Sequence, residues 1–328
     1  MRFFRSAALL ALIVLAPSTS GAPVDPIDAR APVEILADGL GVLRGIAVDA
    51  GGAVYVADRD AGTVTRIGTD ASRTIVADAL DRPVGLAIDS SGRLVIAEER
   101  AGRVVRVESG GARTVLLEAQ QPRWLAIAPD DTLYVSARAL VRTSDPPLDD
   151  ESLAPQVILR LTPALPLTIW ASGFTGVQGL AADDHAVYLA AHGTPGSNVS
   201  GLYAVERTSG AVSFAGGLSQ PMGVALDPLH EMIAADLATR TLARATADGT
   251  TTVASRFASP TGVASDIAGN VFIADAGRVV KLRAPAAPIF GALPAYTKDS
   301  PLNVPLMTEA GAAAFRSEER RVGKECRL

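Results

Sequence analysis

One short phrase returns six times along the chain, as in RGIAVD, VGLAID and MGVALD. The copies begin 40, 39, 55, 44 and 39 residues apart. Repeats of this length are typical of solenoids and propellers, so the repeat constrains the architecture more strongly than any single residue does. The copies start at Arg44, Val84, Arg123, Gln178, Met222 and Thr261.

Each copy is predicted to form four short strands. In the first copy the runs at 45–49, 54–57, 63–67 and 74–76 are rich in β-branched residues and are separated by turn residues. This composition favours strands over helices. Four antiparallel strands in about forty residues describe one blade of a propeller. We therefore expect an all-β fold, a six-bladed β-propeller with four antiparallel strands per blade.

Small residues mark the first strand of most copies, as Gly45 and Ala47 do in the first. Inner strands crowd together where blades converge on a common axis, and a missing side chain permits close backbone approach. The intervening apolar residues, such as Ile46, are then free to pack between blades. The phrase is expected to repeat because each blade narrows toward the same axis.

The sixth copy lacks a fourth strand, because the chain runs into prolines soon after Leu282. A matching strand stands ahead of the first copy, where Val33–Ala37 (VEILA) resembles residues 74–77 (TIVA). We expect this N-terminal strand to pair within the last blade and close the ring over residues 32–283. Closure would remove an exposed sheet edge.

The segments outside the repeats are expected to serve processing and linkage. Residues 1–22 combine two arginines with an apolar core too short to span a bilayer, which is typical of a secretory signal peptide. Residues 284–305 are proline-rich and indicate a linker, and 306–315 resemble the start of a truncated immunoglobulin-like module. Residues 316–328 resemble a translated sequencing adapter, which indicates an artefact. The mature protein is expected to be secreted, extracellular or periplasmic, with no membrane attachment after cleavage.

The formal net charge is −5. Sequence-independent binding to nucleic acid needs a basic surface, so we expect no nucleic-acid partner. The aspartates that end five copies of the repeated phrase could suggest calcium binding. A turn role explains them better, because aspartate starts a tight turn by accepting a hydrogen bond from the backbone two residues on. These residues are Asp49, Asp89, Asp183, Asp227 and Asp266.

The motif GIAVD..G.VYVAD....TV.RI, which starts at Gly45, is similar to the NHL repeat and to the repeat of streptogramin lyases. The resemblance extends from Pro32 to about Leu282. It implies a six-bladed propeller, a scaffold that hosts lyases, lactonases, sensors and adhesion heads. The third copy departs from the pattern, since Trp124 stands where the others have glycine, and the NHL-type asparagine after the second strand is mostly missing.

The resemblance also indicates which loops share a face. In such propellers the loop before each inner strand lies beside the loop that joins the second and third strands. Residues just before the small-residue position should then surround the channel mouth, and they include Arg44, Arg123 and Gln178, with Trp124 beside them. The ends of the second strands should add another column there, which includes Asp58 and Asp236.

Two long insertions fall in second-to-third strand loops of neighbouring blades, at 143–155 and 192–201. Loops on a rigid scaffold often carry function, so these insertions indicate a recognition rim, with His192 on it. The alternative is that surface loops tolerate insertion without any functional reason.

The predicted mouth suits a small anionic or saccharide ligand. Guanidinium groups bind carboxylates in a bidentate manner, and an indole stacks on sugars and cations. The predicted ligand-binding residues are Arg44, Arg123, Trp124, Gln178, His192, Asp58 and Asp236. The alternative is that each arginine pairs with carboxylates such as Asp58 or Asp236.

No catalytic residue, metal ligand or cofactor is predicted. His192 is the one histidine expected on the mouth face, and a single imidazole cannot supply both a base and metal ligands. We therefore expect a non-catalytic, monomeric head that binds a small ligand or another extracellular protein. The alternative is a metal-assisted lyase or lactonase of the streptogramin lyase or gluconolactonase type, with a divalent ion such as calcium or magnesium.

Overall fold

The structure is a computed structural model that describes residues 27–29, 31–138 and 155–284. These residues belong to one compact unit, Met1–Pro285. They form strands and no helix, and therefore contain no helix able to cross a membrane. The predicted signal peptide, the linker beyond Ala284, the immunoglobulin-like start, the charged tail and almost all of the insertion at 143–155 lie outside the described residues.

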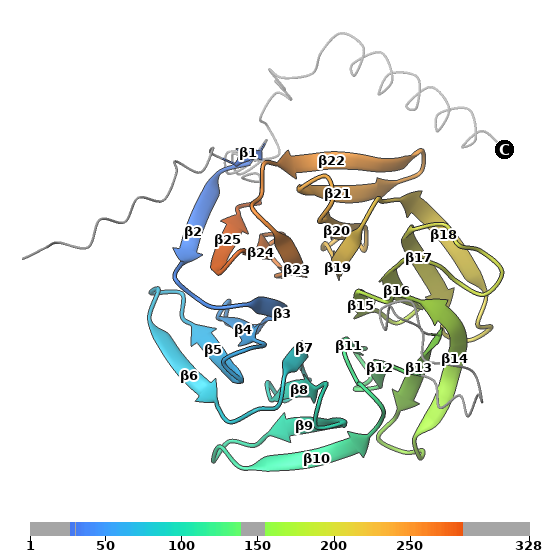
Figure 1. Cartoon of the computed structure of the whole chain (residues 1–328), viewed down its shortest axis with the longest axis horizontal. Helices are drawn as coiled ribbons and strands as arrows, with labels where there is room; N and C mark the ends of the chain where they lie inside the picture. Colours follow the sequence, from blue (N-terminus) through green and yellow to red (C-terminus); the bar gives the residue numbers. More distant parts are fainter. Residues whose placement is uncertain (1–26, 30, 139–154, 285–328) are drawn as a thin grey trace, which may run out of the picture. The chain divides into compact units, whose positions relative to one another are not determined.

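The described residues form six antiparallel sheets around a common centre (Figure 1). This confirms the predicted six-bladed β-propeller with four strands per blade. Blade one contains β3 (Leu43–Val48), β4 (Val54–Asp58), β5 (Thr63–Ile67) and β6 (Arg73–Ala77). Blade two contains β7 (Pro83–Ile88), β8 (Leu94–Glu98), β9 (Arg103–Val107) and β10 (Arg113–Glu118). Blade three contains β11 (Leu125–Ile127), β12 (Leu133–Arg138), β13 (Pro155–Leu161) and β14 (Thr168–Thr175).

The remaining blades follow the same order from the centre outward. Blade four contains β15 (Gly179–Ala182), β16 (Ala186–Ala191), β17 (Gly201–Glu206) and β18 (Val212–Gly217). Blade five contains β19 (Pro221–Leu226), β20 (Met232–Asp236), β21 (Thr241–Thr246) and β22 (Gly249–Ser255). Blade six contains β23 (Pro260–Ser265), β24 (Val271–Asp275), β25 (Arg278–Leu282) and β2 (Val33–Ala37).

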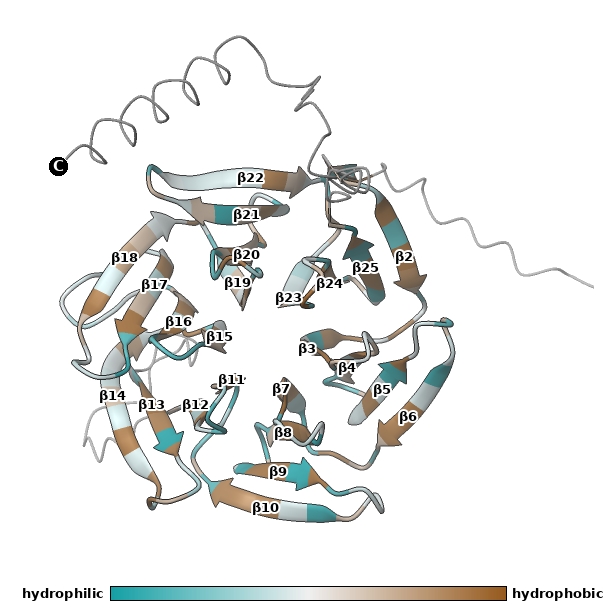
Figure 2. Cartoon of the chain, turned by 180° about the vertical axis from the view of Figure 1, so that it is seen from behind, coloured by the Kyte–Doolittle hydropathy of each residue, from teal (hydrophilic) through white to brown (hydrophobic). Residues whose placement is uncertain are grey.

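The ring is closed by β2, as predicted. This strand pairs antiparallel with β25, with Val33 opposite Leu282 and Ile35 opposite Val280. One hydrophilic residue, Glu34, stands among the apolar residues of β2 (Figure 2), and Ala37 at its end is buried with residues of β24 and β25. The sequence did not predict β1 (Asp28–Ala29), which adds a fifth strand to blade five by pairing with β22.

Glycines at the centre permit the backbones of neighbouring blades to touch. A Cβ atom on Gly45 would lie 2.1 Å from the carbonyl oxygen of Val84 in the next blade, and one on Gly262 would lie 2.3 Å from that of Arg44. Real Cβ atoms do not approach an oxygen so closely. The small residues of the repeat are therefore required by the convergence of the blades.

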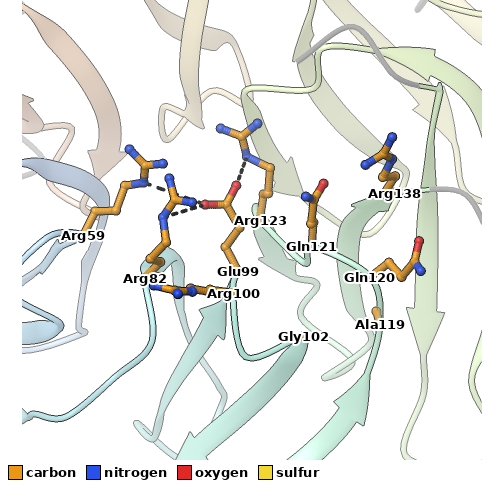
Figure 3. A pocket seen from close by; sticks show the side chains of 10 residues that line it. All are labelled: Arg59, Arg82, Glu99, Arg100, Gly102, Ala119, Gln120, Gln121, Arg123 and Arg138. Atoms are coloured by element: carbon orange, nitrogen blue, oxygen red, sulfur yellow. Dashed lines mark ion pairs between the residues drawn. The ribbon is translucent and has the colours of Figure 1, made fainter. Parts of the chain in front are cut away.

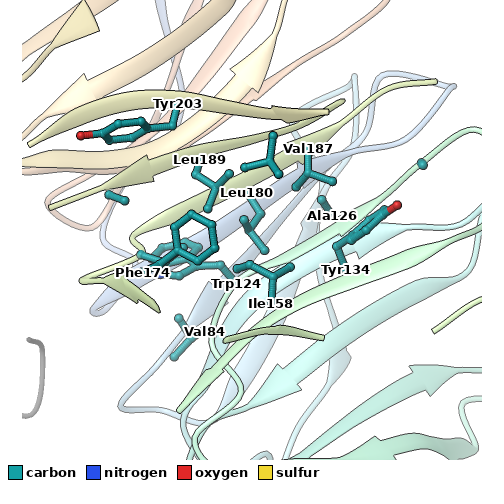
Figure 4. Packing of buried hydrophobic residues seen from close by; sticks show 14 residues of the cluster. Val84, Trp124, Ala126, Tyr134, Ile158, Phe174, Leu180, Val187, Leu189 and Tyr203 are labelled. Atoms are coloured by element: carbon teal, nitrogen blue, oxygen red, sulfur yellow. The ribbon is translucent and has the colours of Figure 1, made fainter. Parts of the chain in front are cut away.

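Six hydrophobic clusters hold the blades together, and each contains residues of at least two neighbouring blades. Ile46 of blade one packs with Phe272 of blade six, and Leu86 of blade two packs with Ala47 of blade one. Figure 4 shows the cluster between blades three and four, which includes Trp124 and Phe174. Burial of apolar surface between blades therefore stabilises the ring at every interface.

The aspartates after the repeated phrase have the predicted turn role. Each accepts a hydrogen bond on Oδ1 from the backbone N–H two residues on, at 2.8–3.0 Å. Asp183 also accepts hydrogen bonds from the Tyr188 hydroxyl and from His230 of blade five. Burial alone would raise the pKa of Asp183, but these bonds and those from the turn backbone outweigh it and lower the pKa from its ordinary value.

Candidate functional site

The two kinds of loop that were expected to share one face do so. In each blade a residue at the end of the second strand, or just after it, donates its backbone N–H to the segment that precedes the inner strand. Arg59 bonds to the Val42 oxygen at 3.0 Å, and Glu99 bonds to the Arg82 oxygen at 3.1 Å. The corresponding donors in the other blades are Arg138, His192, Leu237 and Ala276. This face, which we call the loop face, carries the candidate site.

The carboxylates at the ends of the second strands stabilise these loops. Asp58 and Asp236 each accept several backbone hydrogen bonds, while Asp275 in blade six accepts two and Glu98 in blade two accepts one, from the Asp81 N–H. The donors to Asp58 are the backbone N–H groups of Val42, Asp60 and Ala61. The donors to Asp236 are those of Ser219, Gln220, Ala238 and Thr239. The structure thus gives Asp58 and Asp236 backbone partners, and neither pairs with Arg44 or Arg123.

Replacing Asp236 with alanine is expected to destabilise the fold by about 3 kcal/mol, because four backbone N–H groups lose a charged acceptor that is only 3% exposed. Chemical denaturation would measure the loss, and the exposed Asp248→Ala serves as the matched control. An unchanged denaturation midpoint for Asp236→Ala would contradict this structural role.

A pocket of about 530 Å³ opens on the loop face above blades one, two and three. In contrast, the space at the centre of the ring, bordered by inner strands of all six blades, measures about 30 Å³. A ligand therefore fits beside the axis and not in the central channel. The pocket is lined by Arg59, Arg82, Glu99, Arg100, Gly102, Ala119, Gln120, Gln121, Arg123 and Arg138.

Glu99 lies at the centre of a group of guanidinium groups in this pocket (Figure 3). Its Oε1 is 3.3 Å from Nε of Arg123, and its Oε2 is 3.7 Å from Nε of Arg59 and 3.6 Å from Nε of Arg82. The Glu99 side chain is 11% exposed. One carboxylate therefore shares its charge among three arginines that come from three different blades.

Arg44 reinforces the positive charge of this region. It is half-buried, and burial lowers its pKa from the ordinary value, helped by the positive charge of Arg123. The negative charge of Glu99 acts in the opposite direction. Arg44 and Arg123, which the sequence placed together at the mouth, thus lie in one electrostatic environment, and Arg123 lines the pocket itself.

Trp124 is only 5% exposed and belongs to the hydrophobic cluster between blades three and four. Its backbone is held by Ser136, whose hydroxyl accepts a hydrogen bond from the Trp124 N–H at 3.0 Å. Gln178 is also buried, and its backbone bridges to Ala190 and Gly223. The structure therefore places Trp124 in the core, where its indole has no open face on which a ligand can stack.

His192 lies outside the lining of the arginine pocket. Its Nδ1 is 3.1 Å from the Ser200 hydroxyl, and its backbone N–H bonds to the Thr175 oxygen at 3.0 Å. The ring packs so closely on Gly176 that a Cβ there would lie 2.3 Å from it. The insertion at 192–201 is thus bound to the end of β14 by its first residues.

The sequence missed Glu99, Arg59, Arg82 and Arg138. The residues that reach the loop-face pocket from the second strands stand one position after the column that had been predicted. A signal for them was present, because side chains of an extended chain alternate between two directions. Asp58 and Glu98 turn toward the loop backbone, and the next residues, Arg59 and Glu99, face the pocket.

The pocket does not fit a divalent metal ion. Glu99 is the one carboxylate among its described lining residues, and three guanidinium groups surround it. In the part of the chain that the structure describes, no three His, Cys, Asp or Glu side chains are grouped so that they could hold a metal ion. The donor set of this pocket suits an anion instead.

The chain matches no protein-family model and no curated protein sequence. Its fold is similar to that of many solved structures, which include a gluconolactonase, a virginiamycin B lyase and a regucalcin. A gluconolactonase from Xanthomonas campestris is 19% identical, with a TM-score of 0.67 over 80% of this chain and 95% of that one. A virginiamycin B lyase from Staphylococcus aureus is 14% identical, with a TM-score of 0.55 over 79% and 100%. A regucalcin from Agrobacterium tumefaciens, described as calcium-binding, is 14% identical, with a TM-score of 0.61 over 77% and 93%.

At these identities the likeness shows the fold. The predicted resemblance to the six-bladed propellers of streptogramin lyases is confirmed at that level, and gluconolactonases share the same architecture. Membership of the NHL repeat family stays a prediction.

Proposed function

We propose that the arginine-lined pocket binds a sugar acid or its lactone. The observation that carries this proposal is the pocket itself, where five arginines and one carboxylate line about 530 Å³ on the loop face. Ligand pockets for small molecules have volumes of this order. Guanidinium groups bind carboxylates through paired hydrogen bonds, and the side-chain amides of Gln120 and Gln121 provide groups suited to hydroxyls.

Hydrolysis of a lactone is the activity that the comparisons favour over the predicted non-catalytic head. A gluconolactonase and a lyase share this propeller, and the loop-face pocket offers a suitable electrostatic environment. When water adds to a lactone carbonyl, negative charge develops on its oxygen, the ring C–O bond then breaks, and a hydroxy acid is released. Arg123 and its neighbours would stabilise that charge.

A non-catalytic binding head is the second candidate, and one observation favours it. Glu99, the one carboxylate among the pocket's described lining residues, is engaged by three guanidinium groups at 3.3–3.7 Å. In this arrangement it balances charge and has no contact that would prepare it to activate water. The pocket would then hold an acid without changing it.

Two measurements on the purified chain test the proposal. Calorimetry with gluconate measures binding, and pH-stat titration with glucono-δ-lactone, in EDTA and in calcium, measures hydrolysis. Arg123→Ala is expected to weaken gluconate binding by at least about tenfold, since a hydrogen bond to a charged group is lost. Arg113→Ala, on the exposed start of β10, is the matched control.

The outcomes separate the candidates. Hydrolysis above the rate in buffer, lost in Arg123→Ala and kept in Arg113→Ala, supports a lactonase. Gluconate binding without hydrolysis supports the binding head. If the chain neither binds gluconate nor hydrolyses the lactone, the proposal is wrong.

A further inference from the structure

We propose that the pocket selects ligands that carry two or more negative charges. This inference rests on the proposed function and specifies the class of acid that the pocket prefers. Its starting point is the excess of positive charge among the lining residues. Five arginines face one lining carboxylate, Glu99, and Arg44, which does not line the pocket, interacts electrostatically with Arg123, Arg82 and Glu99.

The ion pairs of these arginines show how much of their positive charge has no negative partner among the described residues. Glu99 serves Arg59, Arg82 and Arg123 at once. Arg100 has a separate partner, Asp81, at 4.0 Å on the exposed side. A single negative charge on a ligand would therefore leave the pocket positively charged, and a second one would neutralise more of the excess.

The positive groups are divided between two regions of the pocket. Arg59, Arg82 and Arg123 gather around Glu99, while Arg138 lies apart from them beside Gln120 and Gln121 (Figure 3). The backbone N–H of Arg138 bonds to the Gln120 oxygen at 2.9 Å, which fixes the end of β12 against this loop. Within the described residues its guanidinium makes no ion pair. A ligand with two separated charges can contact both regions.

Buried polar atoms at the first region point to a missing partner. Glu99 Oε2 and Arg123 Nε are both buried, and neither has a hydrogen-bond partner among the described residues. The ion pairs around Glu99, at 3.3–3.7 Å, are longer than the 2.7–2.9 Å typical of charge-assisted hydrogen bonds. An unsatisfied buried polar atom is costly, so an anionic oxygen that accepts from Arg123 Nε would be stabilised there, and a ligand hydroxyl could donate to Glu99 Oε2.

Two sources supply such a ligand, an acidic oligosaccharide with repeated carboxylates and a phosphorylated sugar. Both present several negative charges on a hydroxyl-rich frame, which is the chemistry that arginines and side-chain amides recognise. Acidic oligosaccharides place their charges on separate sugars, and a phosphate monoester places two on one group. The two sources are therefore distinguished by which probe binds best.

The test is calorimetry of the full chain with gluconate, digalacturonate and glucose 6-phosphate at the same ionic strength. At least one doubly charged probe is expected to bind about tenfold more tightly than gluconate, because it neutralises more of the excess charge. A gain for digalacturonate assigns the acidic saccharide, and a gain for glucose 6-phosphate assigns the phosphate monoester. Equal affinity for all three probes overturns the inference and leaves the proposed function intact.

Variants of the lining residues test where the second negative charge of the ligand binds. Arg138→Gln is expected to reduce the ratio of digalacturonate affinity to gluconate affinity, and Arg113→Gln is the matched control that keeps the ratio. Glu99→Gln is expected to raise the affinity for every anionic probe, because it removes the internal competitor for the arginines. If no probe binds to the wild-type chain, the proposed function itself fails.

Discussion

Replacing Gly45 with alanine is expected to lower the free energy of unfolding by on the order of 3 kcal/mol. The added Cβ would lie 2.1 Å from the carbonyl oxygen of Val84. That oxygen belongs to the backbone of the next blade, so relief requires the inner strands β3 and β7 to separate. Because the ring is closed, the displacement cannot be absorbed at a free end. Denaturant titration followed by far-UV circular dichroism would measure the loss.

Gly110→Ala provides the control for this substitution. Nothing lies within 4 Å of a Cβ added to Gly110, and its backbone is not in the left-handed region. Its alanine variant should therefore stay within about 0.5 kcal/mol of the wild type. A Gly45→Ala protein as stable as the Gly110→Ala protein would show that the blades do not touch at the centre.

A chain that begins at Gly39, and so lacks β2, is expected to lose most of the cooperativity of its thermal transition and to unfold at a lower temperature. The loss leaves β25 as an unpaired edge and removes Ala37, which is 2% exposed, from the cluster that joins blades six and one. Several kcal/mol would be lost, which for a domain of this size lowers the melting midpoint by more than about 10 °C. Exposed edges also pair with other chains, so aggregation is expected.

A chain that begins at Ala31 separates closure from the effect of truncation. It lacks β1, which pairs through only Asp28 and Ala29 with the outside of blade five, but keeps β2. Its transition should remain cooperative and shift by a few degrees. Scanning calorimetry and size-exclusion chromatography would compare the two chains, and equal transitions for both would contradict closure by β2.

The fold could be predicted because each copy repeats the same physical requirements. Glycine at the small-residue position and aspartate at the first turn recur in five of the six blades, so the departure of the third copy is corrected by the others. β1 escaped prediction for the opposite reason. A strand of two residues, Asp28–Ala29, has no periodicity to recognise, and it forms because the edge of β22 is available.

The candidate pocket lies on the face that the sequence indicated, and Arg123 is the one predicted ligand-binding residue among its described lining residues. Glu98 and Glu99 stand side by side in the sequence, yet their environments differ. Glu98 is fully buried and forms an ion pair with Arg103 at 2.6 Å, and Glu99 faces the arginines of the pocket. Alternation indicates that the two glutamates point in opposite directions, but it does not show which one points inward, because the end of the strand and the bulge beside it decide that.

Trp124 shows how position can override residue type. An indole beside arginines suggests a surface for stacking. At the same position in the other copies, however, a Cβ added to the glycine would point at the next blade. Trp124 follows that direction into the cluster with Leu180 and Phe174. The inner strand of its blade, β11, is correspondingly short at three residues. The geometry of the repeat was therefore a better guide than the chemistry of the side chain.

The pairing of β2 with β25 closes the propeller into a ring that is continuous through hydrogen bonds but not through covalent bonds. Arg283 donates its backbone N–H to the Pro32 oxygen at 3.0 Å, so the two ends of the ring are neighbours in space. A short peptide would join them, and new ends could then be opened at an exposed turn such as Gly110–Gly111 without removing any strand pair. The folded ring therefore does not depend on which blade is synthesised first, and a circularly permuted chain is expected to form the same propeller.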